Sequence, residues 1–318
     1  MHNSLIKIGR RILQESIIFL ARPYIRYEFP GWGMVYSTLV GDYRRDYIWK
    51  DSPEKVIRGK IHGFIMHLDM AHWGDRMAYF LGRWYELETQ LFMADLVCPG
   101  DTVVDIGANR GMFTLYASRL VGISGKVFSF EPNPHSLKQL TRELESNSIN
   151  NVTIHPYGVS NEATTLELYV PFTNSGEGTF AKALESQVDR YKVEAKLVAG
   201  DTMLNDEQPA LIKIDVEGYE CHVIEGLSET LNRHHPIIIM EIVSEHLLSC
   251  GSNVQKLVQM MKCFGYVGYQ LLLEKSSHNR VWALKPIVMD GYGYNSVWIH
   301  DSARADSLKT IIQRIRTL

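Results

Sequence analysis

Long hydrophobic runs and paired cysteines are both missing from this sequence of 318 residues. No stretch approaches the roughly 20 apolar residues that a membrane-spanning helix needs. The four cysteines are scattered without a CxxC pair, which argues against a disulfide framework and against a cysteine-based metal site. The formal net charge is only −3, so no overall attraction to nucleic acid is expected. We therefore expect a cytoplasmic protein that does not bind nucleic acid.

The N-terminal segment, residues 4–26, differs from the rest in its charge and its apolar pattern. Leu5, Ile8, Ile12 and Phe19 recur at helical spacing, and five basic residues before residue 27 accompany one acid. Such an amphipathic helix usually packs on its own domain or on a second subunit, and we favour that interpretation. The alternative is a helix that lies on the inner surface of an anionic membrane. A homo-oligomer and a peripheral membrane contact therefore both stay open.

Strands and helices alternate from about residue 84 onward, which predicts a mainly parallel α/β sheet with right-handed crossovers. Two further strands around a polar, glycine-containing loop predict an inserted β-hairpin near residues 163–200. We expect an N-terminal extension over residues 1–83, with contacts to an acceptor, a membrane or a second copy, and an α/β domain over residues 84–318. The expected sheet strands are TVVDIG, GKVFSFEP, NVTIHPYGV, PALIKIDVEG, HPIIIMEIV, YVGYQLLLE and NSVWIHD.

The segment VVDIGANRG, residues 103–111, joins the first of these strands to its helix. A glycine-rich turn at this place is a ligand site, because the carboxyl ends of parallel strands leave a crevice. Dinucleotides need a second glycine two residues after the first, and Asn109 occupies that position. Asp105 can accept a hydrogen bond from an amine, and Gly107 lets the chain pass close to a ligand. The turn therefore favours S-adenosylmethionine (SAM), which has an amino-acid end and no pyrophosphate.

The second strand ends in Glu131, about 20 residues after the turn, where a carboxylate typically accepts hydrogen bonds from ribose hydroxyls. Gly158 and Val159 follow the third strand and are expected near the adenine. Glu86 precedes the first strand and could close over the cofactor. The predicted cofactor site therefore comprises Glu86, Asp105, Gly107, Asn109, Gly111, Glu131, Pro132, Gly158, Val159 and Asp215.

Three motifs in this order, VVDIGANRG, FEPNP and LIKIDVEGYE, resemble the FkbM family of SAM-dependent methyltransferases. The resemblance covers roughly residues 84–300, and the first 80 residues lie outside it. It implies a class I methyltransferase fold, which is Rossmann-like, with a seven-stranded sheet whose last strand is antiparallel. It also implies O-methylation, often of a sugar hydroxyl on a glycolipid, polysaccharide or natural product. A sugar-containing acceptor is thus the expected partner.

Methyl transfer to a hydroxyl requires an acceptor oxygen in line with the methyl group and a base for its proton. Asp215 and Glu217 follow the fourth strand, and Glu241 ends the next one. We expect these three carboxylates to converge, with Asp215 acting in the chemical step. One of them could be the base, or together they could hold a divalent metal that lowers the pKa of the hydroxyl. A purely structural alternative is that Asp215 and Glu217 cap the following helix.

Two other functions fit parts of the same pattern. One is an NAD-dependent oxidoreductase or epimerase, against which Asn109 argues. The other is a catalytically inactive SAM-binding scaffold, against which the complete set of cofactor residues argues. Two histidines, His222 and His246, are weaker candidates for the base than Asp215, because lone histidines more often serve packing than catalysis.

Overall fold

A computed structural model describes residues 2–41, 43–171, 175–181, 190–276, 279–287 and 293–302 of the chain. The chain divides into two compact units, Met1–Glu86 and Leu87–Leu318, here called unit 1 and unit 2. Among the described residues, no helix has the length and apolar character to cross a bilayer.

Unit 1 is more regular than its mixed sequence suggests. The elements after its long first helix are short, because glycines and prolines recur along this part of the sequence. Trp49 and Phe80 pack edge to face in its core, with ring centroids 5.8 Å apart. The buried guanidinium of Arg76 pairs with Asp46 at 2.6 Å. The elements are α1 (His2–Arg26), α2 (Trp32–Val35), a π-helix (Tyr36–Val40), a 3-10 helix (Tyr43–Arg45), α3 (Asp46–Trp49), β1 (Lys55–Arg58), β2 (Ile65–Leu68) and α4 (Trp73–Leu81).

The helix α1 exists as expected, but the predicted stripe does not pack on unit 1. Ile12 and Phe19, from the predicted stripe, are 63% and 80% exposed. The helix instead packs on unit 1 through the opposite side, where Ala21 and Ile25 are buried. Arg22 on the packing side lies over the Tyr79 ring of α4 at 4.4 Å. Both sides of α1 are apolar, so hydrophobic spacing alone could not say which one faces inward.

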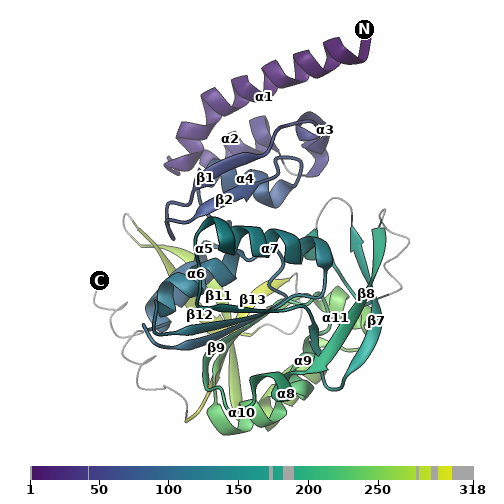
Figure 1. The fold of residues 1–318 in the computed structure, drawn as a ribbon. Helices are drawn as coiled ribbons and strands as arrows, with labels where there is room; N and C mark the ends of the chain where they lie inside the picture. Colours follow the sequence, from purple (N-terminus) through teal and green to yellow (C-terminus); the bar gives the residue numbers. More distant parts are fainter. Residues whose placement is uncertain are drawn as a thin grey trace. The chain divides into compact units, whose positions relative to one another are not determined.

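Unit 2 contains a mixed, mainly parallel sheet with helices on both faces (Figure 1). The strand order is β12-β11-β13-β10-β9-β3-β4-β5, and the five strands from β10 to β5 run parallel. The central strands are rich in β-branched residues and buried on both faces, as a parallel sheet between helices requires. The bounds are β3 (Thr102–Ile106), β4 (Lys126–Phe130), β5 (Val152–His155), β9 (Pro209–Ile214), β10 (Ile237–Ile242), β11 (Tyr266–Ser276), β12 (Asn279–Pro286) and β13 (Tyr294–His300).

The helices of unit 2 cover the sheet in two groups. The helices that follow β3 and β4 cover one face of the sheet. The later helices cover the other face, and most of the main apolar core lies between them and the sheet (Figure 1). Val104, Ile212 and Met240 from three neighbouring strands belong to that core. The helices are α5 (Leu87–Leu96), α6 (Met112–Val121), α7 (Pro134–Ser146), α8 (Gly200–Leu204), α9 (Glu220–Gly226), α10 (Ser228–His234), α11 (Ser244–Ser249) and α12 (Val254–Cys263).

Within the part of the chain that the structure describes, the sheet has eight strands rather than the seven expected, because β12 adds to its edge. β12 pairs antiparallel with β11. Trp282 of β12 explains its attachment: its ring packs on Phe92 of α5, with centroids 5.0 Å apart, and its Nε1 donates to Asp95 at 2.7 Å. The seven predicted strands are all present, and the class I methyltransferase fold is confirmed, with its last strand β13 antiparallel between β10 and β11.

The expected third strand is interrupted after His155, and the expected hairpin builds a second sheet. Pro156, which lacks an N–H, follows β5, and the chain then enters β6 (Gly158–Ser160). β6 pairs parallel with β8 (Arg190–Ala199), which pairs antiparallel with β7 (Thr164–Pro171). The three strands form a separate sheet, with the order β6-β8-β7. Parts of the hairpin loop, residues 172–174 and 182–189, lie outside the described residues.

Candidate functional site

A cavity opens in unit 2 at the carboxyl ends of β3, β4 and β9. The space between its lining atoms is about 540 Å³, part of it open to solvent. The hairpin contributes a wall on one side, through Leu168, Gly176, Gly178 and Phe180. The other lining residues are Ile106, Gly107, Asn109, Glu131, Pro132, Asn133, Gly158, Val159, Asp215, Val216, Glu217 and Tyr219.

The turn after β3 adopts left-handed backbone at three positions. Gly107, Asn109 and Gly111 have φ angles of 79°, 47° and 86°. Asparagine is among the few side chains that tolerate this region, which explains how Asn109 can stand where a dinucleotide fold has glycine. Its side-chain Oδ1 accepts from Ser136 Oγ at 2.9 Å, so this oxygen holds α7. Gly111 lies at the start of α6 and off the cavity wall, where a Cβ would come within 2.2 Å of Leu140.

Glu131 lies at the carboxyl end of β4, on the cavity wall, and ties two loops together. Its two carboxylate oxygens accept from the backbone N–H groups of Asn109 and Asn133, each at 2.7 Å. Burial nevertheless raises the pKa of Glu131 to about 7, against the lowering effect of these two hydrogen bonds. A carboxylate has about four acceptor sites, so two remain for hydroxyl donors. This geometry fits the ribose contact that the sequence predicts.

Asp105 lies beside the cavity rather than among its lining residues. It is almost fully buried, and its Oδ2 accepts from Thr114 Oγ1 of α6 at 2.6 Å. Burial raises the pKa of Asp105, and the nearby Lys213 ammonium partly opposes that rise. Its other oxygen has no hydrogen-bond partner among the described residues. The amine contact expected of Asp105 thus remains a prediction.

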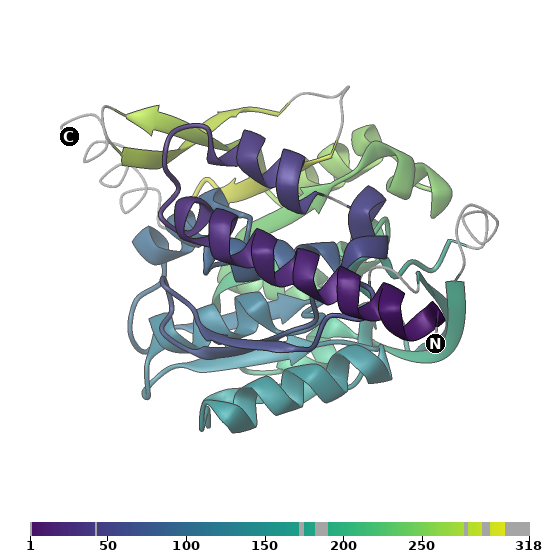
Figure 2. The ribbon, with the colours of Figure 1, turned by 90° about the horizontal axis from the view of Figure 1, so that it is seen from above.

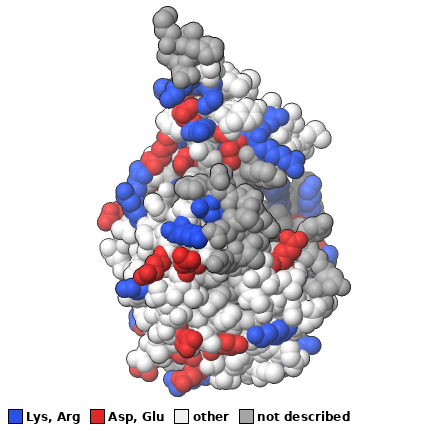
Figure 3. Space-filling view, turned by 90° about the vertical axis from the view of Figure 1, so that its right-hand side faces the viewer, with Lys and Arg blue, Asp and Glu red and all other residues white. Residues whose placement is uncertain are grey.

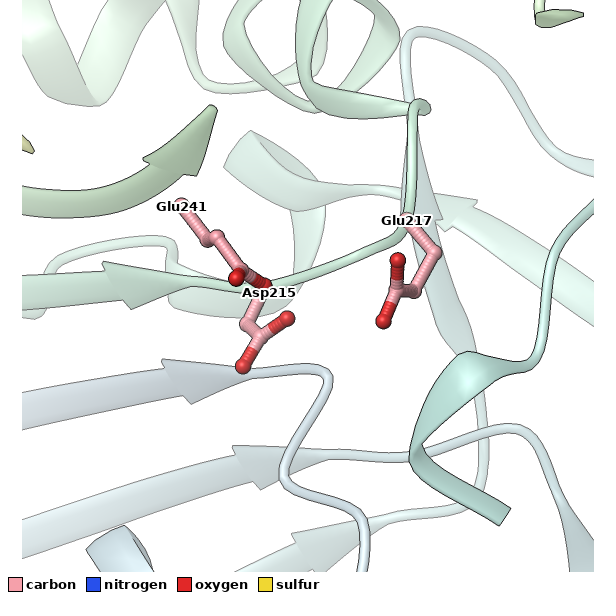
Figure 4. A group of neighbouring side chains, drawn as sticks. All are labelled: Asp215, Glu217 and Glu241. Atoms are coloured by element: carbon pink, nitrogen blue, oxygen red, sulfur yellow. The ribbon is translucent and has the colours of Figure 1, made fainter. Parts of the chain in front are cut away.

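Asp215, Glu217 and Glu241 come together, as the sequence predicts (Figure 4). One oxygen from each lies within 4.8 Å of the other two, and all three side chains are half-buried. Asp215 follows β9, and Glu241 is near the end of neighbouring β10. The Asp215 carboxylate also pairs with the buried Lys213 ammonium at 2.8 Å. Oxygen donors of this kind suit a hard divalent cation, and they suit proton transfer equally well.

Glu217 is held in an unusual backbone conformation beside a histidine. Its φ is 51°, and its carboxylate Oε2 lies 2.6 Å from Nδ1 of His246, in α11. Burial and the negative charges of Asp215 and Glu220 raise the pKa of Glu217 well above its ordinary value. The backbone carbonyl of Glu217 accepts from Thr179 Oγ1 at 3.0 Å, which links this loop to the hairpin. His246 is therefore the histidine candidate that the fold brings to the carboxylates.

Two aromatic residues of the cavity wall were not predicted from the sequence. Tyr219 stacks on His222, with ring centroids 4.1 Å apart and planes inclined by 10°. Phe180, from the hairpin loop, packs against Tyr219 at 4.9 Å. Tyr219 belongs to the motif LIKIDVEGYE, which could have pointed to it as a site residue. Phe180 lies in a polar loop that has no recognisable pattern. The remaining predicted residues divide: Pro132, Gly158 and Val159 line the cavity, while Glu86 is the last residue of unit 1 and its cofactor contact remains a prediction.

The strand order, the glycine turn after β3 and the acid at the end of β4 define a class I SAM-dependent methyltransferase. The Methyltransferase FkbM domain family matches residues 105–268, which is more than half of the chain. The chain belongs to this family, which confirms the resemblance of its three motifs and decides for SAM over NAD.

Individual relatives are distant. Methyltransferase 1 of Beauveria bassiana is 30% identical over 151 residues, covering 41% of this chain and 60% of that protein. Hexuronic acid methyltransferase AglP of Haloferax volcanii is 27% identical over 142 residues, covering 44% and 55%. The chain thus spans little more than half the length of these curated relatives. Among solved structures, methyltransferase FkbM of Methylobacillus flagellatus KT has a TM-score of 0.37 and 14% identity, covering 84% of this chain and 60% of that one.

The raised pKa of Glu131 predicts pH-dependent cofactor binding. Below about pH 7 the carboxyl is protonated in the ligand-free protein, and binding that needs the carboxylate must first remove that proton. The Kd of S-adenosylhomocysteine should therefore rise by up to about tenfold per pH unit as the pH falls from 7 to 6. Calorimetry at several pH values measures this. Glu131→Gln should lose the slope and exposed Glu162→Gln should keep it, whereas a flat wild-type profile would contradict the assigned role.

Proposed function

We propose that this chain transfers the methyl group of SAM to a hydroxyl of a sugar, in a glycan, a glycolipid or a natural product. The observation that carries the proposal is the meeting of the three carboxylates Asp215, Glu217 and Glu241 beside the cavity predicted to hold the cofactor. A hydroxyl acceptor must lose a proton on methylation, and this cluster supplies acceptors for it.

The residues of the cavity fit SAM in chemistry. Bound SAM supplies a methyl group on a sulfonium, already activated for transfer. Glu131 offers free acceptor sites to a ribose, and Gly158 and Val159 offer a small, apolar surface next to it. The turn at Gly107 lies against Asp215, since the N–H of Asp215 donates to the carbonyl of Ile106 at 3.0 Å. The cofactor loop and the proposed catalytic carboxylate are therefore fixed to one another.

Asp215 is the proposed proton acceptor because Lys213 fixes its position. The Lys213 ammonium is almost fully buried and binds one oxygen of Asp215, so the carboxylate is oriented before the acceptor arrives. Glu217 is the second choice, held by its own strained backbone and by the neighbouring His246 ring. If the cluster instead holds a divalent cation, the same three residues are its ligands.

A sugar is supported as the acceptor by the cavity wall and by one relative. Phe180 and Tyr219 offer flat apolar side chains on the hairpin side of the cavity, a surface that suits the face of a sugar ring. One relative of this chain, AglP of Haloferax volcanii, is a hexuronic acid methyltransferase by its name.

Incubation with SAM labelled in its methyl group tests the proposal. The purified chain is mixed with fractionated cell glycans and glycolipids, with hexuronate-containing oligosaccharides as one defined fraction, and products are identified by mass spectrometry. We expect label in a carbohydrate fraction only. Label in protein or nucleic acid, with none in carbohydrate, would contradict a sugar acceptor.

A further inference from the structure

The side of α1 that faces away from unit 1 is apolar and exposed. Of the sixteen large hydrophobic side chains that are exposed among the described residues, twelve belong to unit 1, which is about a quarter of the chain. Six of the twelve lie on α1: Ile6, Ile8, Ile12, Leu13, Phe19 and Leu20. We call these six side chains the outer face of α1.

The outer face is one continuous side of the helix. At 3.6 residues per turn the six side chains fall on the side opposite Ala21 and Ile25, which are buried against unit 1. A shallow groove on this side is lined by Arg11, Ile12, Glu15, Ser16 and Phe19. Seen from above, α1 lies in front of the other elements of unit 1 (Figure 2). A helix that is apolar on both sides is ordinarily covered on both, so the outer face calls for a partner.

The charge of unit 1 indicates the kind of partner. Residues 1–86 carry thirteen Lys and Arg against nine Asp and Glu, whereas residues 87–318 carry twenty against twenty-seven. Arg11 is exposed and lines the groove beside Ile12 and Phe19 of the outer face. Figure 3 shows Lys and Arg side chains, with acidic ones among them, in the upper part of the molecule. The one acid of α1, Glu15, accepts from Lys55 at 3.1 Å. The face is thus an apolar surface with positive charge at its edge.

We propose that the outer face of α1 binds an anionic membrane surface, with α1 lying in the plane of the headgroups. Apolar side chains including an aromatic ring, with the Arg11 cation beside them, match the pattern of helices that lie at such an interface. A second copy of the chain would bring the same positive edge against this one, whereas anionic headgroups complement it. The proposal is independent of the acceptor, because it rests on unit 1 alone.

Co-sedimentation with vesicles tests the proposal on the full chain. We expect binding to vesicles that mix phosphatidylglycerol with phosphatidylcholine, and much weaker binding to phosphatidylcholine alone. The double variant Ile12→Ser, Phe19→Ser should bind at least tenfold more weakly. Arg11→Gln should cost about fivefold, since a cation near an anionic surface contributes about 1 kcal/mol. The control Ile123→Ser changes a side chain that is 98% exposed in unit 2, and it should bind like the wild type.

Two results would overturn the proposal, provided that circular dichroism shows folded variants and that the double variant still binds SAM. The first is equal binding of the wild type and the double variant to anionic vesicles. The second is a wild type that ignores vesicles but is dimeric by light scattering, with a monomeric double variant. That second result would assign the outer face to a second copy of the chain.

Discussion

Replacing Asp215 with asparagine should lower turnover by about 10²–10⁴-fold, the usual contribution of a positioned acid–base group. Asparagine keeps the size and the acceptor oxygen of the side chain but loses the charge that would take the acceptor's proton. SAM affinity and folding should stay close to wild type, because Glu131 and the turn at Gly107 are unchanged and Asp105 still faces Lys213. Turnover at saturating SAM and acceptor, with calorimetry for SAM, measures both parts.

Chelation separates the two roles open to Asp215. If the residue acts alone as a base, wild-type activity should survive a chelator. If the three carboxylates hold a cation, a chelator should abolish activity, Mg²⁺ or Mn²⁺ should restore it, and Glu241→Gln should cost about as much as Asp215→Asn. Asp206→Asn makes the same chemical change at an exposed position before β9 and should leave turnover unchanged. Near-wild-type turnover of Asp215→Asn would remove the residue from both roles.

Replacing Gly107 with alanine should destabilise unit 2 by about 3 kcal/mol or more and abolish SAM binding. A Cβ at this position would lie 1.8 Å from the backbone carbonyl oxygen of Asp215, and φ is +79°. The left-handed backbone costs about 1–2 kcal/mol and forced overpacking about 1–3 kcal/mol more. A backbone oxygen cannot rotate out of the way, so the cofactor loop and the strand end must separate. Denaturant unfolding and calorimetry measure the two losses.

Gly251→Ala is the matched control for this prediction. Gly251 belongs to the same unit and has a φ of +76°, but a Cβ there would meet no atom within 4 Å. It should therefore show the conformational cost alone, about 1–2 kcal/mol, with normal SAM affinity. Equal losses in the two variants would mean that the close approach of Gly107 to Asp215 has no role in holding the site.

The meeting of the three carboxylates could be predicted because they lie at or just after the ends of neighbouring strands. Asp215, Glu217 and Glu241 each follow or end a buried strand, and the carboxyl ends of neighbouring parallel strands share one edge. The turn at Gly107 and Asn109 could be recognised because it follows the first strand of a parallel sheet and has Asn109 where a dinucleotide site needs its second glycine. These are local signals combined with one topological rule, and they require no knowledge of long-range packing.

The parts that were missed depend on contacts between distant segments. Phe180 reaches the cavity only because the hairpin folds over it, and nothing in its polar loop marks it. The pairing of Trp282 with Asp95, nearly 190 residues away, secures an edge strand that its own sequence signals weakly. The side of α1 that faces inward carries Ala21 and Ile25. The helix is apolar on two sides, so the spacing of its hydrophobic residues does not show which side is buried.

The atom that receives the methyl group is the most direct test of the proposed function. The chain is supplied with SAM carrying a ¹³C-methyl group and with the carbohydrate fraction that takes up label, and the product is examined by two-dimensional NMR. The account predicts a methyl carbon with the shift of a methoxy group and a long-range correlation to a sugar ring carbon. A methyl group correlated to nitrogen or directly bonded to carbon would contradict it.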